Sequence, residues 1–347
     1  MKLAVTAIVV TIVAGAHSSA PPAPGYRLPG QLRALAAAGP RVAIATSGGP
    51  ASCLIRVVAL TSRRATAVAP PRSCRDEEAD VWVSELWLGR SALAAETIGS
   101  SSPHGELFEL WTGPLPRGPL RERGAWGWTD SDPDEPAYGC AWSVAAGGGV
   151  IAMVRVPNRL GAANGVADEP TCPAPPAARI VLLGAPRPAV TVAGSWNILA
   201  TDGKRLALAR LGVDGAQTGE LALVDLRGKR LRTPAVSRAV VRAALWGKLT
   251  PEGLVLETRR RLYGPGWSVA GGDLVTASQG RLFYLKRRAI HVRRIRGRAD
   301  RVLLSVRDPY VQFAAGSFGL AVATTTEEAT TVRRIPWRTI DTVMPRR

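Results

Sequence analysis

The segment 126–135 carries the densest polar and aromatic chemistry in the sequence. Two tryptophans precede three aspartates at alternate positions, and we predict ligand binding at Trp126, Trp128, Asp130, Asp132 and Asp134. Closely spaced carboxylates can supply several of the oxygens that Ca²⁺ requires. Aromatic rings beside carboxylates also suit a saccharide, whose apolar face stacks on a ring while its hydroxyl groups are hydrogen-bonded. The alternatives that need no ligand are a solvated acidic loop and tryptophans packed in the core.

This segment departs from the calcium-binding EF-hand loop at three positions. Pro133 and Glu135 replace the variable residue and the turn glycine, and Ala141 stands where that loop has its bidentate glutamate. Zinc is disfavoured because the sequence contains no Cys-x-x-Cys pair. We predict no cofactor and no metal, with Ca²⁺ as the one ion left open.

Catalytic groups are sparse in this sequence. The histidines, His17, His104 and His291, do not lie beside a nucleophile motif such as Gly-x-Ser-x-Gly, which weighs against a Ser-His-Asp hydrolase. Paired carboxylates for glycoside cleavage stay open, because side chains from distant segments can converge in a channel. Candidates of this kind are Asp80, Glu85, Glu96 and Asp202. We favour a non-enzymatic protein and keep a hydrolase or lyase of cell-envelope glycans as the alternative.

Basic residues outnumber acidic ones by 45 to 27, which gives a net charge of +18. Such a surface attracts anionic partners, for example an envelope polymer or a lipid surface. Arginine is concentrated in the run 259–261 and in the segment 281–301, where the predicted contacts with an anionic surface are Arg293, Arg294, Arg296 and Arg298. Interleaved apolar residues in that segment also fit the solvated face of a half-buried strand. Nucleic acid is not an expected partner, because no nucleic-acid-binding motif occurs.

The N-terminus has the layout of a secretory signal peptide. Lys2 precedes an apolar run from Leu3 to Val13, and small residues follow. This run is shorter than the ~20 residues that a membrane-spanning helix needs. We predict a signal peptide and processing region over 1–20, a Pro/Gly-rich linker over 21–32, the main domain over 33–340 and a basic tail over 341–347. The protein is then secreted or extracytoplasmic, associated with the cell envelope, monomeric and without a transmembrane segment.

The cysteines agree with export, because disulfides persist in oxidising compartments. There are four, Cys53, Cys74, Cys140 and Cys172, which allow three pairings. We expect the two sequence-local pairings, Cys53 with Cys74 and Cys140 with Cys172. Each would close one loop-rich segment and stabilise the fold by roughly 3 kcal/mol.

A unit of two short strands around a Gly or Pro turn recurs along the chain. In seven copies the first apolar residue after the turn is Val42, Ala92, Val150, Leu206, Leu254, Leu282 or Leu320. Neighbouring positions are 28 to 58 residues apart, which brackets the ~40 to 50 residues of a four-stranded propeller blade. A third strand is expected in several units, at 53–60, 106–111, 179–183, 220–226 and 289–295. The segment Gln31 to Ala38 is the only short helical candidate.

The clearest unit is Gly203 to Lys229, in which the strands LALARL and LALVDL lie between turns with glycine. Through this unit the sequence resembles exported β-propeller proteins in general. It lacks the signatures of the Trp-Asp and kelch repeats. The resemblance implies a ring of radial sheets around a central channel, with ligands on one face. We predict an all-β propeller of seven blades, or six as the alternative. We further predict an exported binding or scaffold protein that recognises a ligand, or an unidentified protein or glycan partner, through one face.

Overall fold

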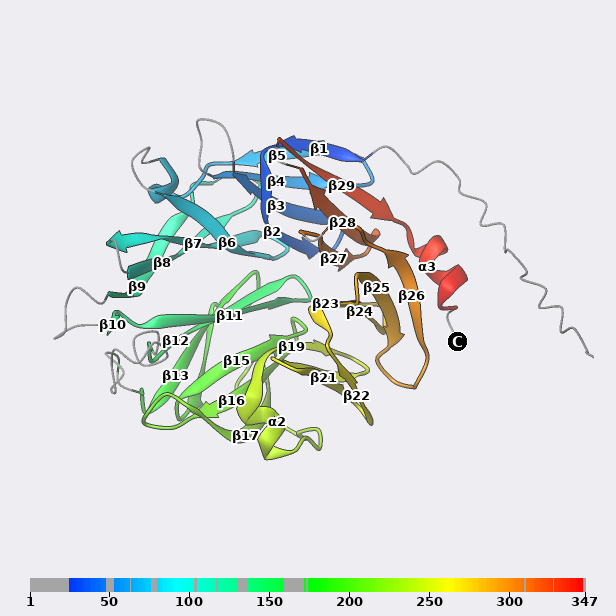
Figure 1. The fold of residues 1–347 in the computed structure, drawn as a ribbon. Coiled ribbons are helices and arrows are strands. Elements are labelled where there is room, and N and C mark those ends of the chain that lie inside the picture. The colour runs from blue at the N-terminus through cyan, green and yellow to red at the C-terminus, as the bar shows by residue number, and fades with distance from the viewer. Residues whose placement is uncertain are drawn as a thin grey trace, which may run out of the picture.

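The strands of this protein form seven antiparallel sheets arranged in a ring. The computed structural model describes residues 25–345, except 48–52, 63, 76–79, 103–104, 117, 130–136, 159–171, 173, 309 and 327. In this part of the chain six sheets have four strands and one has five. Figure 1 shows the sheets following one another around a centre, and neighbouring innermost strands contact each other around the full circle. The chain is therefore a seven-bladed β-propeller, as the sequence predicted.

Blades I to IV occupy the first two thirds of the chain. Blade I contains β2 (Gln31–Ala38), β3 (Arg41–Ser47), β4 (Leu54–Ala59) and β5 (Arg64–Val68). Blade II contains β6 (Val81–Leu88), β7 (Ala92–Ser102), β8 (Gly105–Pro114), β9 (Arg121–Thr129) and β10 (Ala137–Tyr138). Blade III contains β11 (Ala141–Gly147), β12 (Val150–Val156), β13 (Ala177–Leu183) and β14 (Ala189–Ala193). Blade IV contains β15 (Trp196–Thr201), β16 (Arg205–Leu211), β17 (Gln217–Asp225) and β18 (Arg230–Leu231).

Blades V to VII complete the ring. Blade V contains β19 (Ala244–Thr250), β20 (Gly253–Thr258), β21 (Arg261–Gly264) and β22 (Trp267–Ala270). Blade VI contains β23 (Asp273–Ser278), β24 (Arg281–Lys286), β25 (Ala289–Arg294) and β26 (Asp300–Ser305). Blade VII contains β27 (Gln312–Gly316), β28 (Gly319–Thr325), β29 (Ala329–Ile335) and β1 (Tyr26–Pro29). The helices in the described part of the chain are short: η1 (Ser73–Arg75), α2 (Arg238–Ala243) and α3 (Trp337–Val343).

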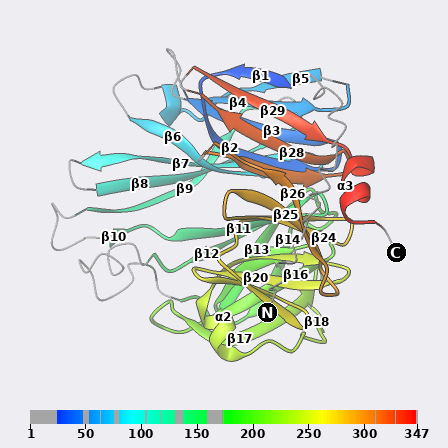
Figure 2. The same cartoon turned by 45° about the vertical axis from the view of Figure 1, so that its right-hand side comes forward.

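Blade VII is built from both ends of the described chain. Its outermost strand, β1, pairs antiparallel with β29, so that Leu28 lies opposite Thr330. Figure 2 shows β1 beside the C-terminal strands β28 and β29. Leu28 is buried with Val332 in one apolar cluster. The ring is thus closed by a strand within residues 21–32, the segment predicted as a linker, so the propeller begins at residue 26 rather than 33.

The repeat positions read from the sequence all lie in second strands. Val42, Ala92, Val150, Leu206, Leu254, Leu282 and Leu320 occur at or next to the start of β3, β7, β12, β16, β20, β24 and β28. These strands are apolar because both of their faces are covered by neighbouring blades, and β12, for example, has five consecutive buried residues. The interval of 28 residues between Leu254 and Leu282 reflects the compact blade V. The five predicted third strands correspond to β4, β8, β13, β17 and β25.

The helical prediction for Gln31 to Ala38 is wrong, because this segment is the strand β2. Its alanines favour a helix intrinsically. In the structure it pairs along its length with β3 and contacts the innermost strands of both neighbouring blades. Leu32 and Ala34 are buried while Gln31 and Arg33 are exposed. Tertiary burial thus outweighs helix propensity, which amounts to less than about 1 kcal/mol per residue.

A short helix, α3, packs beside blades VI and VII after the last strand. Ile340 is fully buried in this helix, and Asp341 forms an ion pair with Arg281 of β24 at 2.5 Å. The Arg281 guanidinium is buried, donates to the carbonyl of Met344 at 2.6 Å and lies over the Trp337 ring at 5.4 Å. These contacts fix α3 to blade VI, as Figure 1 shows at the red end of the chain.

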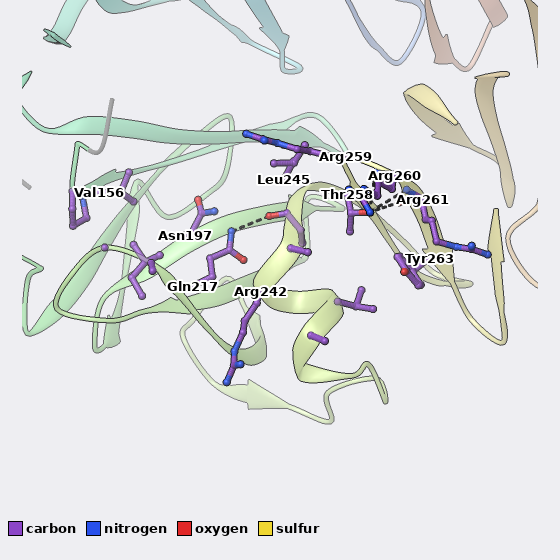
Figure 3. Close-up of a pocket in the computed structure, with 18 residues that line it drawn as sticks. Val156, Asn197, Gln217, Arg242, Leu245, Thr258, Arg259, Arg260, Arg261 and Tyr263 are labelled. Atoms are coloured by element: carbon purple, nitrogen blue, oxygen red, sulfur yellow. Dashed lines mark hydrogen bonds between the residues drawn. The ribbon is translucent and has the colours of Figure 1, made fainter. Parts of the chain in front are cut away.

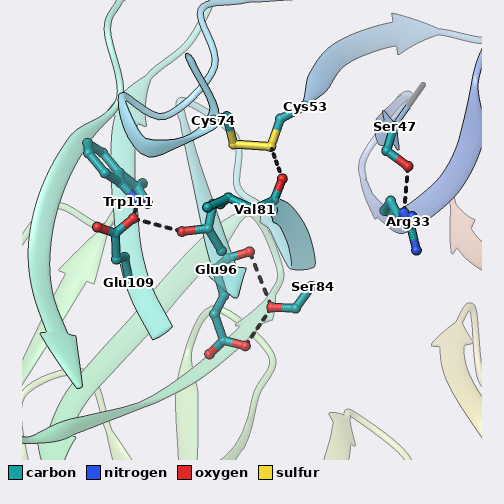
Figure 4. The surroundings of a disulfide bond; sticks show 10 residues. Arg33, Ser47, Cys53, Cys74, Val81, Ser84, Glu96, Glu109 and Trp111 are labelled. Carbon is teal, nitrogen blue, oxygen red and sulfur yellow. Dashed lines mark hydrogen bonds between the residues drawn. A yellow bond between two sulfur atoms is a disulfide. The ribbon is translucent and has the colours of Figure 1, made fainter. Parts of the chain in front are cut away.

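Both sequence-local disulfides are present. Cys53 is bonded to Cys74, and Cys140 to Cys172. The first bond joins the start of β4 in blade I to η1, which leads into blade II, and both of its cysteines are buried in the apolar cluster shared by these blades. Figure 4 shows this bond above β6. Among the described residues, no helix has the length and apolar character needed to cross a membrane.

Candidate functional site

A cavity of about 840 Å³ occupies the centre of the ring and is lined by residues of all seven blades. One end is formed by turns between first and second strands, including Gly39, Arg90 and Gly149. These turns are linked directly: the Arg90 N–H donates to the Gly149 carbonyl at 2.7 Å, and the Ser317 N–H donates to the Gly39 carbonyl at 2.8 Å. The predicted hairpin turn at Gly147 to Gly149 is therefore present and forms part of the cavity wall.

Most of the cavity wall is alanine, glycine and leucine, but its ionisable side chains are distinctive. Glu85, Lys248 and Glu257 line it together with Arg41 and Arg90. Glu85 belongs to the innermost strand of blade II, while Lys248 and Glu257 are on the first two strands of blade V. Charged groups in a largely apolar cavity are costly unless something compensates them. This is the pattern expected of a functional site.

A β-bulge positions the carboxyl groups of blade II. The register between β6 and β7 shifts between Val83 and Glu85, so Ser84 is the extra residue. Its hydroxyl group donates to Glu96 Oε1 at 2.8 Å, as Figure 4 shows. Glu85 lies directly opposite Glu96, and directly paired residues project from the same face of a sheet. The bulge therefore places two carboxyl groups side by side, a device that is common next to functional sites.

The pKa values of these carboxyl groups follow from their surroundings. Burial raises the pKa of Glu96 to about 7; the Ser84 hydrogen bond lowers it and the neighbouring charge of Glu85 raises it further. Burial also raises the pKa of Glu85, against the opposing effect of Lys248. Two like charges at adjacent positions disfavour double ionisation. Near neutral pH this pair can therefore hold a proton.

Blade V contributes the opposite charge. Lys248 is on β19, and burial lowers its pKa although Glu257 and Glu85 both favour its charged form. Burial raises the pKa of Glu257 to about 7, with Lys248 opposing this and Asp273 of blade VI adding to it. The electrostatic cluster therefore spans blades II, V and VI. Glu257, with its pKa raised to about 7, can accept or donate a proton near neutral pH.

Two tryptophans accompany these charges. Trp87 follows Glu85 by two residues on β6, and Trp246 precedes Lys248 by two residues on β19, so each pair shares one face of its strand. Both residues line the cavity, and Trp87 also packs against the apolar cluster between blades II and III. Trp246 is 52% exposed, which is unusual for so large an apolar side chain. It lies directly opposite Glu257 because of a bulge at Leu245. The cavity thus offers two aromatic surfaces beside hydrogen-bonding groups of both signs.

The raised carboxyl pKa values predict that stability depends on pH. A carboxyl group with a folded-state pKa near 7 and an unfolded one near 4.5 holds its proton more tightly in the folded state. The stability that this tighter proton binding adds is fully present below about pH 4.5 and is lost as the pH rises through 7. Replacing Glu96 with glutamine keeps an acceptor for Ser84 and removes the charge. We expect Glu96→Gln to raise the free energy of unfolding at pH 8 by up to about 3 kcal/mol, and to change little at pH 4.5.

Urea unfolding at both pH values measures this effect. The exposed Glu122 on β9 of the same blade, changed to glutamine, is the matched control and should leave the pH profile unaltered. If Glu96→Gln changed the free energy of unfolding equally at pH 4.5 and pH 8, the proposed burial of the Glu96 charge would be contradicted.

The residues predicted as a ligand-binding locus are only partly described. Asp130, Asp132 and Asp134 lie outside the described residues. Trp126 is buried against Phe108, with ring centroids 5.8 Å apart and nearly parallel planes. Trp128 donates its indole N–H to Glu106 at 3.3 Å. Trp126 thus packs in the core, and binding of a ligand or Ca²⁺ by this segment stays a prediction.

The arginines predicted to contact an anionic surface occupy different environments. Arg293 is buried and stacks on the Trp267 ring at 4.1 Å, near Asp300. Arg294 donates to the carbonyl of Pro345 at 2.5 Å. Arg296 and Arg298 are exposed in the turn between β25 and β26. Arg296 also donates its Nε–H to the Glu252 carbonyl at 2.8 Å, and contact with an anionic surface stays a prediction.

Of the four candidate carboxylates, two belong to the central cluster. Glu85 and Glu96 do, whereas Asp202 pairs with Arg205 at 2.6 Å in the turn between β15 and β16. Asp80 is exposed just before β6. Sequence reasoning missed Lys248, Glu257 and Trp246. The available signal was a lysine within an apolar first strand and a glutamate in an apolar second strand of the same unit.

Comparisons with known proteins assign no family to this chain. No protein-family model matches the sequence, and no curated protein matches it significantly. Among solved structures, it is similar to BamB from Moraxella catarrhalis, with 8% identity, a TM-score of 0.38 and coverage of 88% of this chain and 86% of that one. It is also similar to the β-propeller domain of the Trilobed protease from Pyrococcus furiosus, with 12% identity, a TM-score of 0.34 and coverage of 82% and 99%.

A third similar structure is a polysaccharide lyase, an ulvan lyase of family PL25, with 11% identity, a TM-score of 0.37 and coverage of 87% of this chain and 91% of that one. At such identities the likeness concerns the fold alone. These proteins differ in function, so they do not assign one to this chain. The protein is a seven-bladed β-propeller, closed by its N-terminal strand, with a charged and aromatic central cavity.

Proposed function

We propose that this is an exported binding protein that recognises a saccharide in its central cavity. One observation carries the proposal: tryptophans and charged residues line the same central cavity. They are Trp87 and Glu85 of blade II and Trp246, Lys248 and Glu257 of blade V. Indole rings stack on the apolar faces of sugars, and charged side chains of both signs match hydroxyl groups, which donate and accept hydrogen bonds. The volume of about 840 Å³ falls in the range of ligand pockets.

Export is part of this proposal and is supported by the two disulfide bonds. Such bonds persist in oxidising compartments. The signal-peptide layout of residues 1–20 supports the same conclusion from the sequence, although that segment lies outside the described residues.

Loss of the exposed indole provides the direct test. We expect Trp246→Ala to weaken binding of a neutral oligosaccharide about 10- to 100-fold, because one sugar–aromatic stacking contact is lost. Since Trp246 is half exposed, the fold should be retained. Isothermal titration against cello-, xylo-, manno- and chito-oligosaccharides identifies the ligand. Trp82→Ala is the matched control, because Trp82 is on β6 outside the cavity and packs under Arg33. Absence of saccharide binding, or equal losses in both variants, would refute the proposal.

A glycan hydrolase or lyase is the second candidate, favoured by the carboxyl groups of Glu96 and Glu257, whose pKa values are raised to about 7. Groups with such values can act as general acids or bases at neutral pH. Incubation with the oligosaccharide that binds separates the two functions. A binding protein leaves it intact. An enzyme shortens it, and Glu257→Gln would then abolish product formation while affinity changes only a few-fold.

A further inference from the structure

A second cavity, of about 750 Å³, lies between blades IV and V and is lined by four arginines. They are Arg242 of α2 and Arg259, Arg260 and Arg261 at the turn between β20 and β21 (Figure 3). No aspartate or glutamate is among the described residues that line it. The cavity therefore concentrates positive charge that nothing in its own described wall neutralises.

The arginine turn is held in place by one threonine. The Thr258 hydroxyl group donates to the Arg261 carbonyl at 2.9 Å and accepts from the Arg261 N–H at 3.1 Å. Arg261 also donates to Ser268 at 2.9 Å, which fixes its side chain. Within the described part of the chain, the guanidinium groups of Arg259 and Arg260 have no ion-pair or hydrogen-bond partner, and both side chains are exposed. They are available to a ligand.

The opposite side of this cavity carries neutral amides. Gln217 donates its Nε2 to the Ala244 carbonyl at 2.9 Å, which fixes the orientation of its amide. Its Oε1 is buried and has no hydrogen-bond donor. Asn197 lines the same cavity. Figure 3 shows Gln217 and Asn197 between Val156 and the arginine turn. A buried acceptor without a donor indicates that a hydroxyl or amide N–H from a ligand, or a water molecule, completes this site.

We propose that this cavity binds an acidic saccharide, whose carboxylates pair with Arg259 and Arg260 and whose hydroxyl group donates to Gln217 Oε1. Guanidinium groups bind carboxylates through paired hydrogen bonds. A fully ionised inorganic anion such as sulfate would satisfy the arginines but has no hydroxyl group to donate to the amide oxygen. The site goes beyond the proposed function, because it is separate from the central cavity: Leu245 lines this cavity while the adjacent Trp246 lines the central one.

Binding of oligogalacturonate, which carries one carboxylate per sugar, tests this proposal, with its methyl ester as the uncharged probe and inorganic sulfate as the anion without a hydroxyl donor. We expect oligogalacturonate to bind at least 30-fold more tightly than either. The double variant Arg259→Ala/Arg260→Ala should lose at least 30-fold in affinity and show a weaker salt dependence. Gln217→Leu should lose about 5- to 20-fold without a change in salt dependence.

Arg287→Ala/Arg288→Ala is the matched control, because these exposed arginines occupy the corresponding turn of blade VI and the charge change is identical. It should alter affinity less than 3-fold. Equal losses in both double variants, equal binding of the ester, or sulfate binding as tight as that of the acidic saccharide would each overturn the proposal. Trp246→Ala should leave this site unaffected, so that failure here and failure of the central cavity are distinguishable.

Discussion

Gly148→Ala is expected to destabilise the fold by more than about 4 kcal/mol or to prevent folding. Gly148 is in the turn between β11 and β12, with φ +57°. A Cβ atom added there would lie 1.9 Å from the carbonyl oxygen of Asp202 and 2.9 Å from the Cα of Gly203. Both neighbours are backbone atoms of the next blade, so relief of the clash requires that blades III and IV move apart. Thermal and urea unfolding followed by circular dichroism measure the loss.

Gly39→Ala separates this clash from the cost of the backbone conformation. Gly39 occupies the equivalent turn of blade I with φ +55°, and an added Cβ would meet nothing within 4 Å. The left-handed conformation alone costs an alanine roughly 1 to 2 kcal/mol. We therefore expect a small loss for Gly39→Ala and a much larger one for Gly148→Ala. Similar losses at the two positions would show that the turns of neighbouring blades are not packed as closely as described.

The double variant Cys53→Ala/Cys74→Ala is expected to lose at least about 3 kcal/mol of stability. The bond closes a loop across 21 residues, and its loss increases the entropy of the unfolded chain by an amount corresponding to about 3 kcal/mol. Both cysteines are also buried between blades I and II, so their removal leaves a cavity with a further cost. Chemical denaturation under oxidising conditions measures the loss.

The second disulfide provides the comparison for this variant. Cys140 and Cys172 are separated by 32 residues, so loop closure alone predicts a slightly larger loss for their removal. Cys140 and Cys172 are only half-buried, so little packing is lost with them. We expect the loss for Cys53→Ala/Cys74→Ala to equal or exceed that for Cys140→Ala/Cys172→Ala. A much smaller loss for the first pair would contradict its role in joining the two blades.

Much of the architecture could be predicted from the sequence because second strands have a strong local signal. Each is covered on both faces, so it is a continuous apolar run preceded by a turn, as at Val150 and Leu206. The closing strand β1 has no comparable signal. Its four residues include Pro29, and only Leu28 is fully buried. Its pairing with β29 joins residues about 300 positions apart, which local pattern cannot reveal.

The central site could be predicted only in part, for a related reason. The sequence predicted Glu85 and Glu96 as candidate carboxylates, but their proximity depends on the bulge at Ser84 and on the register that follows it. In the sequence, Lys248 and Glu257 look like the ordinary polar residues of strands in which apolar and polar side chains alternate. They become a site because the closure of seven blades brings blades II and V to one cavity. The most conspicuous local chemistry, around Trp126, instead contributes a buried aromatic side chain to the core.

The measurement that tests the central claim most directly is the response of the indole N–H signals in a ¹H–¹⁵N NMR spectrum as a saccharide is added. The protein has ten tryptophans, and Trp87→Phe and Trp246→Phe variants assign the two in the cavity. If the central cavity is the recognition site, the signals of Trp87 and Trp246 shift and saturate with the same affinity, while that of Trp82 stays in place. Binding that leaves both cavity indoles unchanged and shifts Trp128 alone would contradict this account.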